Sequence, residues 1–134
     1  MVAMGLAFHA SSPYRDQIVA TAESMRQLVL LMLGSESAAI FVAERSGQVV
    51  GMIGMSAFVH PLSFQMAAHE VFWWVNPEAR GSAAAIRLLH AGETWARAQG
   101  ATVVQMVAPD AAVGVIYQRL GYQAIETMYQ RRLT

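Results

Sequence analysis

The sequence contains no cysteine and few charged residues. The absence of cysteine from all 134 residues excludes disulfides, thiolate metal sites and a cysteine nucleophile. Charged residues make up only 13%, and nine basic residues balance nine acidic ones. A formal net charge of zero argues against electrostatic binding of nucleic acid or of an acidic membrane.

Long apolar runs and a recognisable leader are missing as well. The longest apolar run, Leu28 to Leu33, is too short to span a bilayer, and the first residues lack the basic segment of a signal peptide. A cytoplasmic protein is therefore expected. The histidines show no metal-ligand spacing, so no metal site is predicted; they are His9, His60, His69 and His90.

Hydrophobic residues make up 55% of the chain, which is typical of a globular α/β protein whose sheet is covered on both faces. No repeat or linker divides the sequence, so residues 1–134 are predicted to form a single domain. Apolar periodicity gives the order helix, β-hairpin, strand, helix, strand, helix, strand. The helices are expected at Ile18–Leu33, before Gly100 and at Ala111–Leu120, and the strands at Ala39–Glu44, Val49–Val59, Glu70–Val75, Thr102–Val107 and Gln123–Leu133.

The most informative segment is VFWWVNPEARGSAAAIRLLHAGETWARAQGA, residues 71–101. An apolar strand runs into an Arg-Gly-Ser-Ala turn that opens a helix. Backbone amides at such a turn and at a helix N-terminus bind anions, so the segment predicts a phosphate site. The alternative is a tight strand-to-helix turn with no ligand.

This segment resembles the acyl-CoA-binding motif of the GCN5-related N-acetyltransferases (GNAT family), and GQVVGMIGM and VIYQRLGYQAIETMYQRRL resemble other parts of the same family. The resemblance is to a small phage or bacterial type. It implies a mixed, mostly antiparallel central sheet with splayed parallel strands and helices on both faces. Residues 1–35 match less well and leave room for only a short first strand and a compressed first helix.

The resemblance implies that coenzyme A binds at the turn through its pyrophosphate. The residues matched to R-x-x-G-x-G/A and its surroundings are Arg80, Gly81, Ser82, Ala83, Ala84 and Ala85. Ala83 replaces the first family glycine, but its methyl group is small and compatible with helical geometry. Ser82 offers an additional hydroxyl donor.

Two further parts of the family site map onto this chain. The backbone of Trp74 and Val75 corresponds to the strand end that contacts the pantetheine arm, and the tryptophan rings themselves are expected to pack in the core. Tyr117 matches the family tyrosine that protonates the departing thiolate, and Asp110 matches a residue near coenzyme A. Asp110 is equally well placed to cap the following helix, and Tyr117 to pack its ring against the sheet.

Glu70 and His69 are the candidates for a base that removes a proton from the amine acceptor. Strand alternation places them on opposite faces, and the position of Glu70 resembles that of a family glutamate. A solvated strand-end acid is the alternative.

The leading hypothesis is an acetyl-CoA-dependent N-acetyltransferase that transfers the acetyl group directly to a primary amine of a small molecule or protein. The alternatives are a non-catalytic acyl-CoA-binding or regulatory module, and a toxin-like enzyme acting on aminoacyl-tRNA. The last would need a basic surface that this sequence lacks. A homodimer is a further expectation for so apolar a chain.

Overall fold

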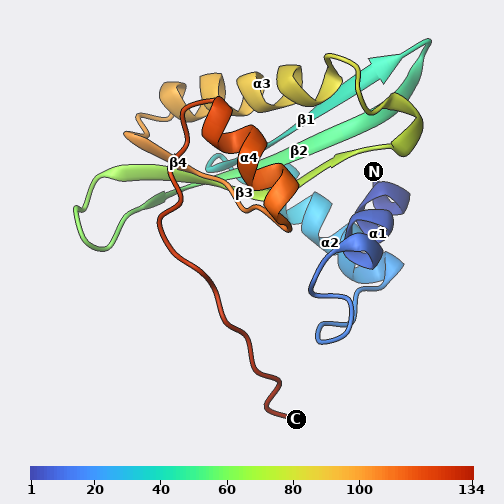
Figure 1. The fold of residues 1–134 in the computed structure, drawn as a ribbon, viewed down its shortest axis with the longest axis horizontal. Helices are drawn as coiled ribbons and strands as arrows, with labels where there is room; N and C mark the ends of the chain where they lie inside the picture. The colour runs from blue at the N-terminus through green and yellow to red at the C-terminus, as the bar shows by residue number, and fades with distance from the viewer.

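The structure is a computed structural model that describes residues 1–134. Its elements are α1 (Val2–Ser11), α2 (Ala22–Leu33), β1 (Ala38–Arg45), β2 (Gln48–Val59), β3 (Met66–Val75), the 3₁₀ turn η1 (Pro77–Ala79), α3 (Ala84–Ala98), β4 (Val103–Gln105) and α4 (Ala111–Arg119). The strands form one sheet in the order β1-β2-β3-β4, with α1 and α2 on one face and α3 on the other (Figure 1). This is a single-domain α+β architecture.

The sheet is antiparallel except for its last pair. β1 pairs with β2 and β2 with β3 in antiparallel register, whereas β3 and β4 are parallel. The predicted hairpin between β1 and β2 is confirmed, and both turn residues, Ser46 and Gly47, have positive φ (52° and 76°). Positive φ at two successive residues twists the turn in the sense of the strands it joins.

Two apolar clusters fill the two sides of the sheet. On the α3 side, buried residues include Ile53, Met55 and Leu88. On the α1/α2 side, Met4, Met32, Met52 and Phe72 form the second cluster. Trp73 packs against the first cluster and Trp74 against the second, so the two tryptophans lie in the core on opposite faces, as expected from strand alternation.

A β-bulge interrupts β3. Gly54 pairs with Phe72 and the next residue, Met55, pairs with Glu70, so Val71 is an additional residue with no partner of its own on β2. Gly54 faces the ring of Phe72, where an added Cβ would lie 2.6 Å from the ring carbon Cζ. The absence of a side chain at position 54 therefore lets Phe72 pack flat on β2 beside the bulge.

The expected short first strand is wrong: residues 2–11 form helix α1 instead. The segment contains three alanines, one methionine and one leucine, which favour helix, and Gly5 permits close contact with Met25 of α2. The second helix begins at Ala22 rather than at Ile18. Thr21 and Ser24 form a reciprocal capping box that fixes this start.

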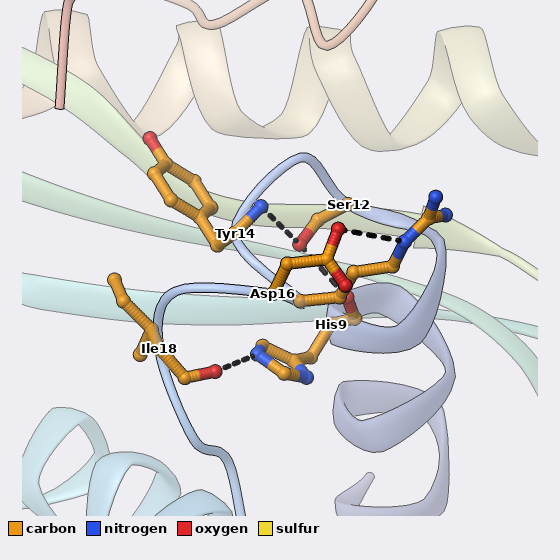
Figure 2. Close-up of polar contacts among 6 residues, drawn as sticks. His9, Ser12, Tyr14, Asp16 and Ile18 are labelled. Carbon is orange, nitrogen blue, oxygen red and sulfur yellow. Dashed lines mark hydrogen bonds and ion pairs between the residues drawn. The ribbon is translucent and has the colours of Figure 1, made fainter. Parts of the chain in front are cut away.

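The connection between α1 and α2 is held by local polar contacts (Figure 2). His9 Nε2 donates to the carbonyl of Ile18 at 2.6 Å, and the amide of Tyr14 donates to Ser12 Oγ at 3.2 Å. No helix in the protein has both the length and the apolar content needed to cross a membrane.

The predicted last strand, Gln123–Leu133, is also wrong. Residues after Gly121 have no regular secondary structure and extend away from the body of the protein (Figure 1). Because the predicted strand Thr102–Val107 shortens to Val103–Gln105, β4 offers only a three-residue edge for pairing. The segment's large apolar side chains remain mostly exposed; they are Ile125, Met128, Tyr129 and Leu133.

Candidate active site

The turn after β3 has the predicted strand-turn-helix geometry. Gly81 has φ +81°, in the region that favours glycine, and helix α3 begins three residues later. Ser82 Oγ donates to the carbonyl of Ala79 at 2.6 Å and accepts from the amide of Ala84 at 3.3 Å. No side chain caps α3, whose N-cap residue is Ala83. The first-turn amides of a 15-residue helix thus lie beside small side chains, which suits an anion.

Arg80 is exposed but does not extend into solvent. Its Nε donates to the carbonyl of Val75 at 2.9 Å, and its guanidinium carbon lies 4.7 Å from the centroid of the Trp74 ring. The arginine therefore folds back over the end of β3. A ligand that used the Val75 carbonyl would have to displace this hydrogen bond.

β3 and β4 pair only over three residues and then diverge. The ladder ends where His69 pairs with Gln105, so residues 70–75 have no strand partner on that side. The amide of Asn76 donates to the carbonyl of Val50 on β2. In an antiparallel pair, successive residues direct their backbone N–H and C=O groups alternately toward and away from the partner strand. Those of Trp74 therefore point toward β2, and those of Val75 point away from it. Of the two predicted backbone positions, Val75 is the one that faces the gap between the diverging strands.

Glu70 lies at the vertex where the strands separate. Its Oε2 accepts a hydrogen bond from the amide of Val107, just after β4, at 3.2 Å, and another from the hydroxyl of Tyr117 at 3.3 Å. The carbonyl oxygen of Val107 also lies 3.3 Å from that hydroxyl, so its one proton has two acceptors. Burial raises the pKa of Glu70 to about 7, although both hydrogen bonds act in the opposite direction. A carboxyl group with this pKa exchanges protons near neutral pH.

The bulge at Val71 decides which side chains share a face with Glu70. Glu70 and Trp73 are three positions apart in the sequence, so a regular strand would place them on opposite faces. With Val71 as an additional residue, both lie on the α3 side and both contact Tyr117. His69 lies on the other face against the ring of Phe58, and burial lowers its pKa.

The C-terminus of α4 places Tyr122 against Tyr117. Gly121 has φ +92°, its amide donates to Gln118, and the amide of Tyr122 donates to the carbonyl of Tyr117, which together form a Schellman motif. The motif brings Tyr122 onto Tyr117, with ring centroids 5.4 Å apart, and Tyr117 also stacks on Trp73 at 5.7 Å. Burial and the neighbouring Glu70 carboxylate raise the pKa of Tyr117 well above its ordinary value. Its hydroxyl is therefore protonated at neutral pH.

Asp110 serves as the N-cap of α4, and its Oδ1 accepts from the amide of Val113 at 2.9 Å. This is the capping role that its place in the sequence allowed. Contact between Asp110 and coenzyme A stays a prediction.

Sequence reasoning missed a contact between α3 and the segment after α4. The hydroxyl of Tyr122 donates to Glu93 Oε1 at 2.6 Å. Glu93 also lies 3.8 Å from Arg97, the pair that the i,i+4 spacing predicts. The Gly-Tyr pair after Tyr117 was a signal for the ring contact through the Schellman motif, but nothing in the sequence indicated that Glu93 would meet Tyr122.

A cleft of about 430 Å³ lies on the opposite flank of α3, toward β1. It shares Ser82, Ala83 and Ala84 with the turn, and its rim carries the charged residues Glu44, Arg45 and Arg87. Glu70 and Tyr117 do not line it. The cleft, which adjoins the start of α3, and the vertex of the diverging strands are thus separate features.

Comparison with solved structures shows the same fold in known acetyltransferases. The aminoglycoside antibiotic 6'-N-acetyltransferase of Acinetobacter haemolyticus superposes with a TM-score of 0.72 and 19% identity over 90% of this chain and 86% of that one. The ribosomal-protein-alanine N-acetyltransferase of Brucella melitensis has a TM-score of 0.71 and 17% identity over 98% and 93%. A transcriptional regulator of Bacillus halodurans has a TM-score of 0.79 and 18% identity over 99% and 91%.

The sheet, with its diverging parallel pair and the turn before α3, defines the acetyltransferase class of α+β fold. A model of the acetyltransferase (GNAT) family matches residues 8–122, and the chain belongs to this family. A comparison with curated protein sequences finds no match.

Proposed function

We propose that this protein transfers an acetyl group from acetyl-CoA to a primary amine by direct transfer, with Glu70 as the base and Tyr117 as the acid. The observation that carries the proposal is the hydrogen bond between these two side chains at the vertex of β3 and β4. One is a carboxyl group with a pKa of about 7, and the other is a hydroxyl that keeps its proton. Acetyl transfer to an amine needs both groups, because the amine loses a proton and the departing sulfur gains one.

The pyrophosphate of acetyl-CoA would bind at the Gly81–Ala85 turn and the first amides of α3, and its pantetheine arm would run along the open side of β3 past Val75. Arg80 would leave the Val75 carbonyl and pair with the phosphates. The small side chains of Ala83, Ala84 and Ala85 support this assignment, because larger ones would cover the amides.

In the proposed reaction the amine nitrogen attacks the thioester carbonyl carbon, and the carbon–sulfur bond breaks as the new carbon–nitrogen bond is completed. Glu70 takes the proton that the amine loses. Tyr117 gives its proton to the departing sulfur, which leaves as the thiol of coenzyme A. The acetyl group passes directly between substrates, so no covalent enzyme intermediate forms.

Two measurements test the proposal. Isothermal titration calorimetry with acetyl-CoA tests binding, and thiol release across aminoglycosides, polyamines and peptide N-termini tests turnover. The chain contains no lysine, so acetyl-lysine on a protein acceptor cannot come from the enzyme itself. Absence of acetyl-CoA binding would overturn the proposal.

A second candidate function is a non-catalytic acyl-CoA-binding or regulatory module. Two departures from the family pattern motivate it: Ala83 replaces a family glycine, and residues 2–11 form a helix where the resemblance implies a short first strand. One structural neighbour is described as a transcriptional regulator. Tight binding of acetyl-CoA without turnover of any amine would support this second function.

A further inference from the structure

One hydrogen bond links helix α3 to the residue that follows α4. Tyr122 and Glu93 meet at 2.6 Å, the shortest hydrogen bond between two side chains in the protein. The Glu93 side chain is only 21% exposed, so water competes weakly for the carboxylate. Burial, together with the hydrogen bond to Glu93, raises the pKa of Tyr122, and its hydroxyl therefore stays a donor.

Tyr122 is in turn fixed to Tyr117 in two ways. Its amide donates to the Tyr117 carbonyl at 3.0 Å, and its ring contacts the Tyr117 ring. Tyr117 contacts Trp73 with the same ring and reaches Glu70 with its hydroxyl. A continuous set of contacts thus runs from α3 through Tyr122 to the proposed acid.

Helix α4 needs such a link. It has only nine residues, Tyr117 is its one buried side chain, and the chain after Gly121 has no regular structure that could hold its end. Short helices depend on tertiary contacts for their order. The other side-chain hydrogen bonds of the C-terminal segment, Gln130 to Gln17 and Tyr14 to Met128, lie far along it.

We propose that Tyr122 and Glu93 are positioning residues for Tyr117. By tying the end of α4 to α3, they hold the Tyr117 hydroxyl at Glu70 and in a fixed place relative to the turn that begins α3. The inference rests on the proposed function, since it assigns these residues a part in the same reaction. Neither residue touches the reacting atoms.

The experiment compares four variants with the wild type. Glu93→Ala and Tyr122→Phe each remove the hydrogen bond, whereas Glu93→Gln keeps an acceptor oxygen. Arg97→Ala removes only the exposed partner of Glu93 and serves as the matched control. Circular dichroism and thermal unfolding verify folding of every variant, and Tyr122→Phe provides a second route if Glu93→Ala does not fold.

Two readouts separate positioning from simple stability. The first is kcat against KM for acetyl-CoA: Glu93→Ala and Tyr122→Phe should lower kcat by about 3- to 10-fold and change KM by less than about twofold. Glu93→Gln and Arg97→Ala should stay close to the wild type. The second is the carboxyl titration of Glu70, followed by ¹³C NMR in the free protein. A displaced Tyr117 donates less to Glu70, so the pKa of Glu70 should rise in Glu93→Ala and Tyr122→Phe.

An unchanged kcat and an unchanged Glu70 titration in both variants would overturn the inference, while leaving turnover by the wild type, and hence the proposed function, intact. If the wild type binds acetyl-CoA but acetylates nothing, the proposed reaction fails and the NMR titration still decides whether Tyr122 and Glu93 position Tyr117.

Discussion

The hydroxyl of Tyr117 donates to the carboxyl group of Glu70 at 3.3 Å, across 47 residues of sequence. Glu70 comes from β3, where the bulge at Val71 sets the face on which it lies, and Tyr117 comes from α4. The contact joins the two groups to which the proposed reaction assigns its proton transfers.

Replacing Tyr117 with phenylalanine tests the assignment of the acid. We expect kcat to fall by about 10²-fold, because the thiolate would leave without a proton donor. The dissociation constant for acetyl-CoA should change by less than about threefold, since the ring remains stacked on Trp73. Steady-state kinetics and calorimetry provide the two values. An unchanged kcat would remove Tyr117 from the mechanism.

The pH dependence of turnover tests Glu70 as the base. A base must be unprotonated to accept a proton, so kcat should be low below pH 7, rise through the Glu70 pKa of about 7, and level off above it. Glu70→Gln should remove this rise and leave a low, flat profile. A wild-type profile without a transition near pH 7, at saturating substrates, would contradict the assignment.

The same pKa shift predicts a pH dependence of stability. Between pH 4.5 and about 7 the folded protein holds a proton on Glu70 that the unfolded chain has lost, so the free energy of unfolding falls as pH rises through this window. The loss should total about 3 kcal/mol for this group. Glu70→Gln cannot lose that proton, so the difference in unfolding free energy between the two proteins should change over this pH range. Urea unfolding at pH 4.5, 6 and 8 measures it, and a constant difference would exclude the predicted burial of the charge.

Arg80→Ala tests whether this side chain moves from the Val75 carbonyl to the phosphates when acetyl-CoA binds. If Arg80 moves from Val75 to the phosphates, its loss should weaken acetyl-CoA binding by about tenfold, the usual scale for one charge-assisted contact. If Arg80 only covers the Val75 carbonyl, the variant should bind acetyl-CoA more tightly. Arg26→Ala, an exposed change on α2 at the other face of the sheet, is the control. Calorimetry at fixed ionic strength measures the dissociation constant of acetyl-CoA for each variant.

Two glycine-to-alanine substitutions should change the free energy of unfolding in opposite directions, one beside the bulge and one within α4. Gly54→Ala would place a methyl group against the ring of buried Phe72 and should reduce the free energy of unfolding by about 1–3 kcal/mol. Gly114→Ala lies within α4 with no atom closer than 3.8 Å and should raise that free energy by about 0.5–1 kcal/mol. Chemical denaturation measures both values, and a neutral Gly54→Ala would show that β2 and Phe72 can separate at little cost.

The middle of the chain could be predicted from its sequence because its signals are local. The β1–β2 hairpin, the tryptophan-rich strand, the turn at Gly81 and helix α3 all carry strong periodicity or glycines with positive φ. The family assignment rested on these segments together with VIYQRLGYQAIETMYQRRL, and the family model over residues 8–122 confirms it.

The two ends of the chain could not be predicted in this way. Residues 2–8 contain no polar side chain, so no alternation separates strand from helix, and contact with α2 decides the outcome. Residues 123–133 have strand-forming composition, but a strand also needs an edge with which to pair, and that requirement is non-local. The contact between Tyr117 and Glu70 was equally hidden, because a bulge cannot be recognised from alternation alone.

The number of residues between Phe72 and Glu70 that pair with β2 determines the face of the sheet on which Glu70 lies. A chain without Val71 would pair Phe72 and Glu70 with consecutive residues of β2, as they are paired now, and would keep the carboxyl group beside α4. An insertion between Glu70 and Phe72 that forced a second full ladder step would instead pair Glu70 with Ser56 and turn its carboxyl group to the opposite face, away from Tyr117. Natural length variation at this point would therefore remove the carboxyl group from Tyr117 without any substitution.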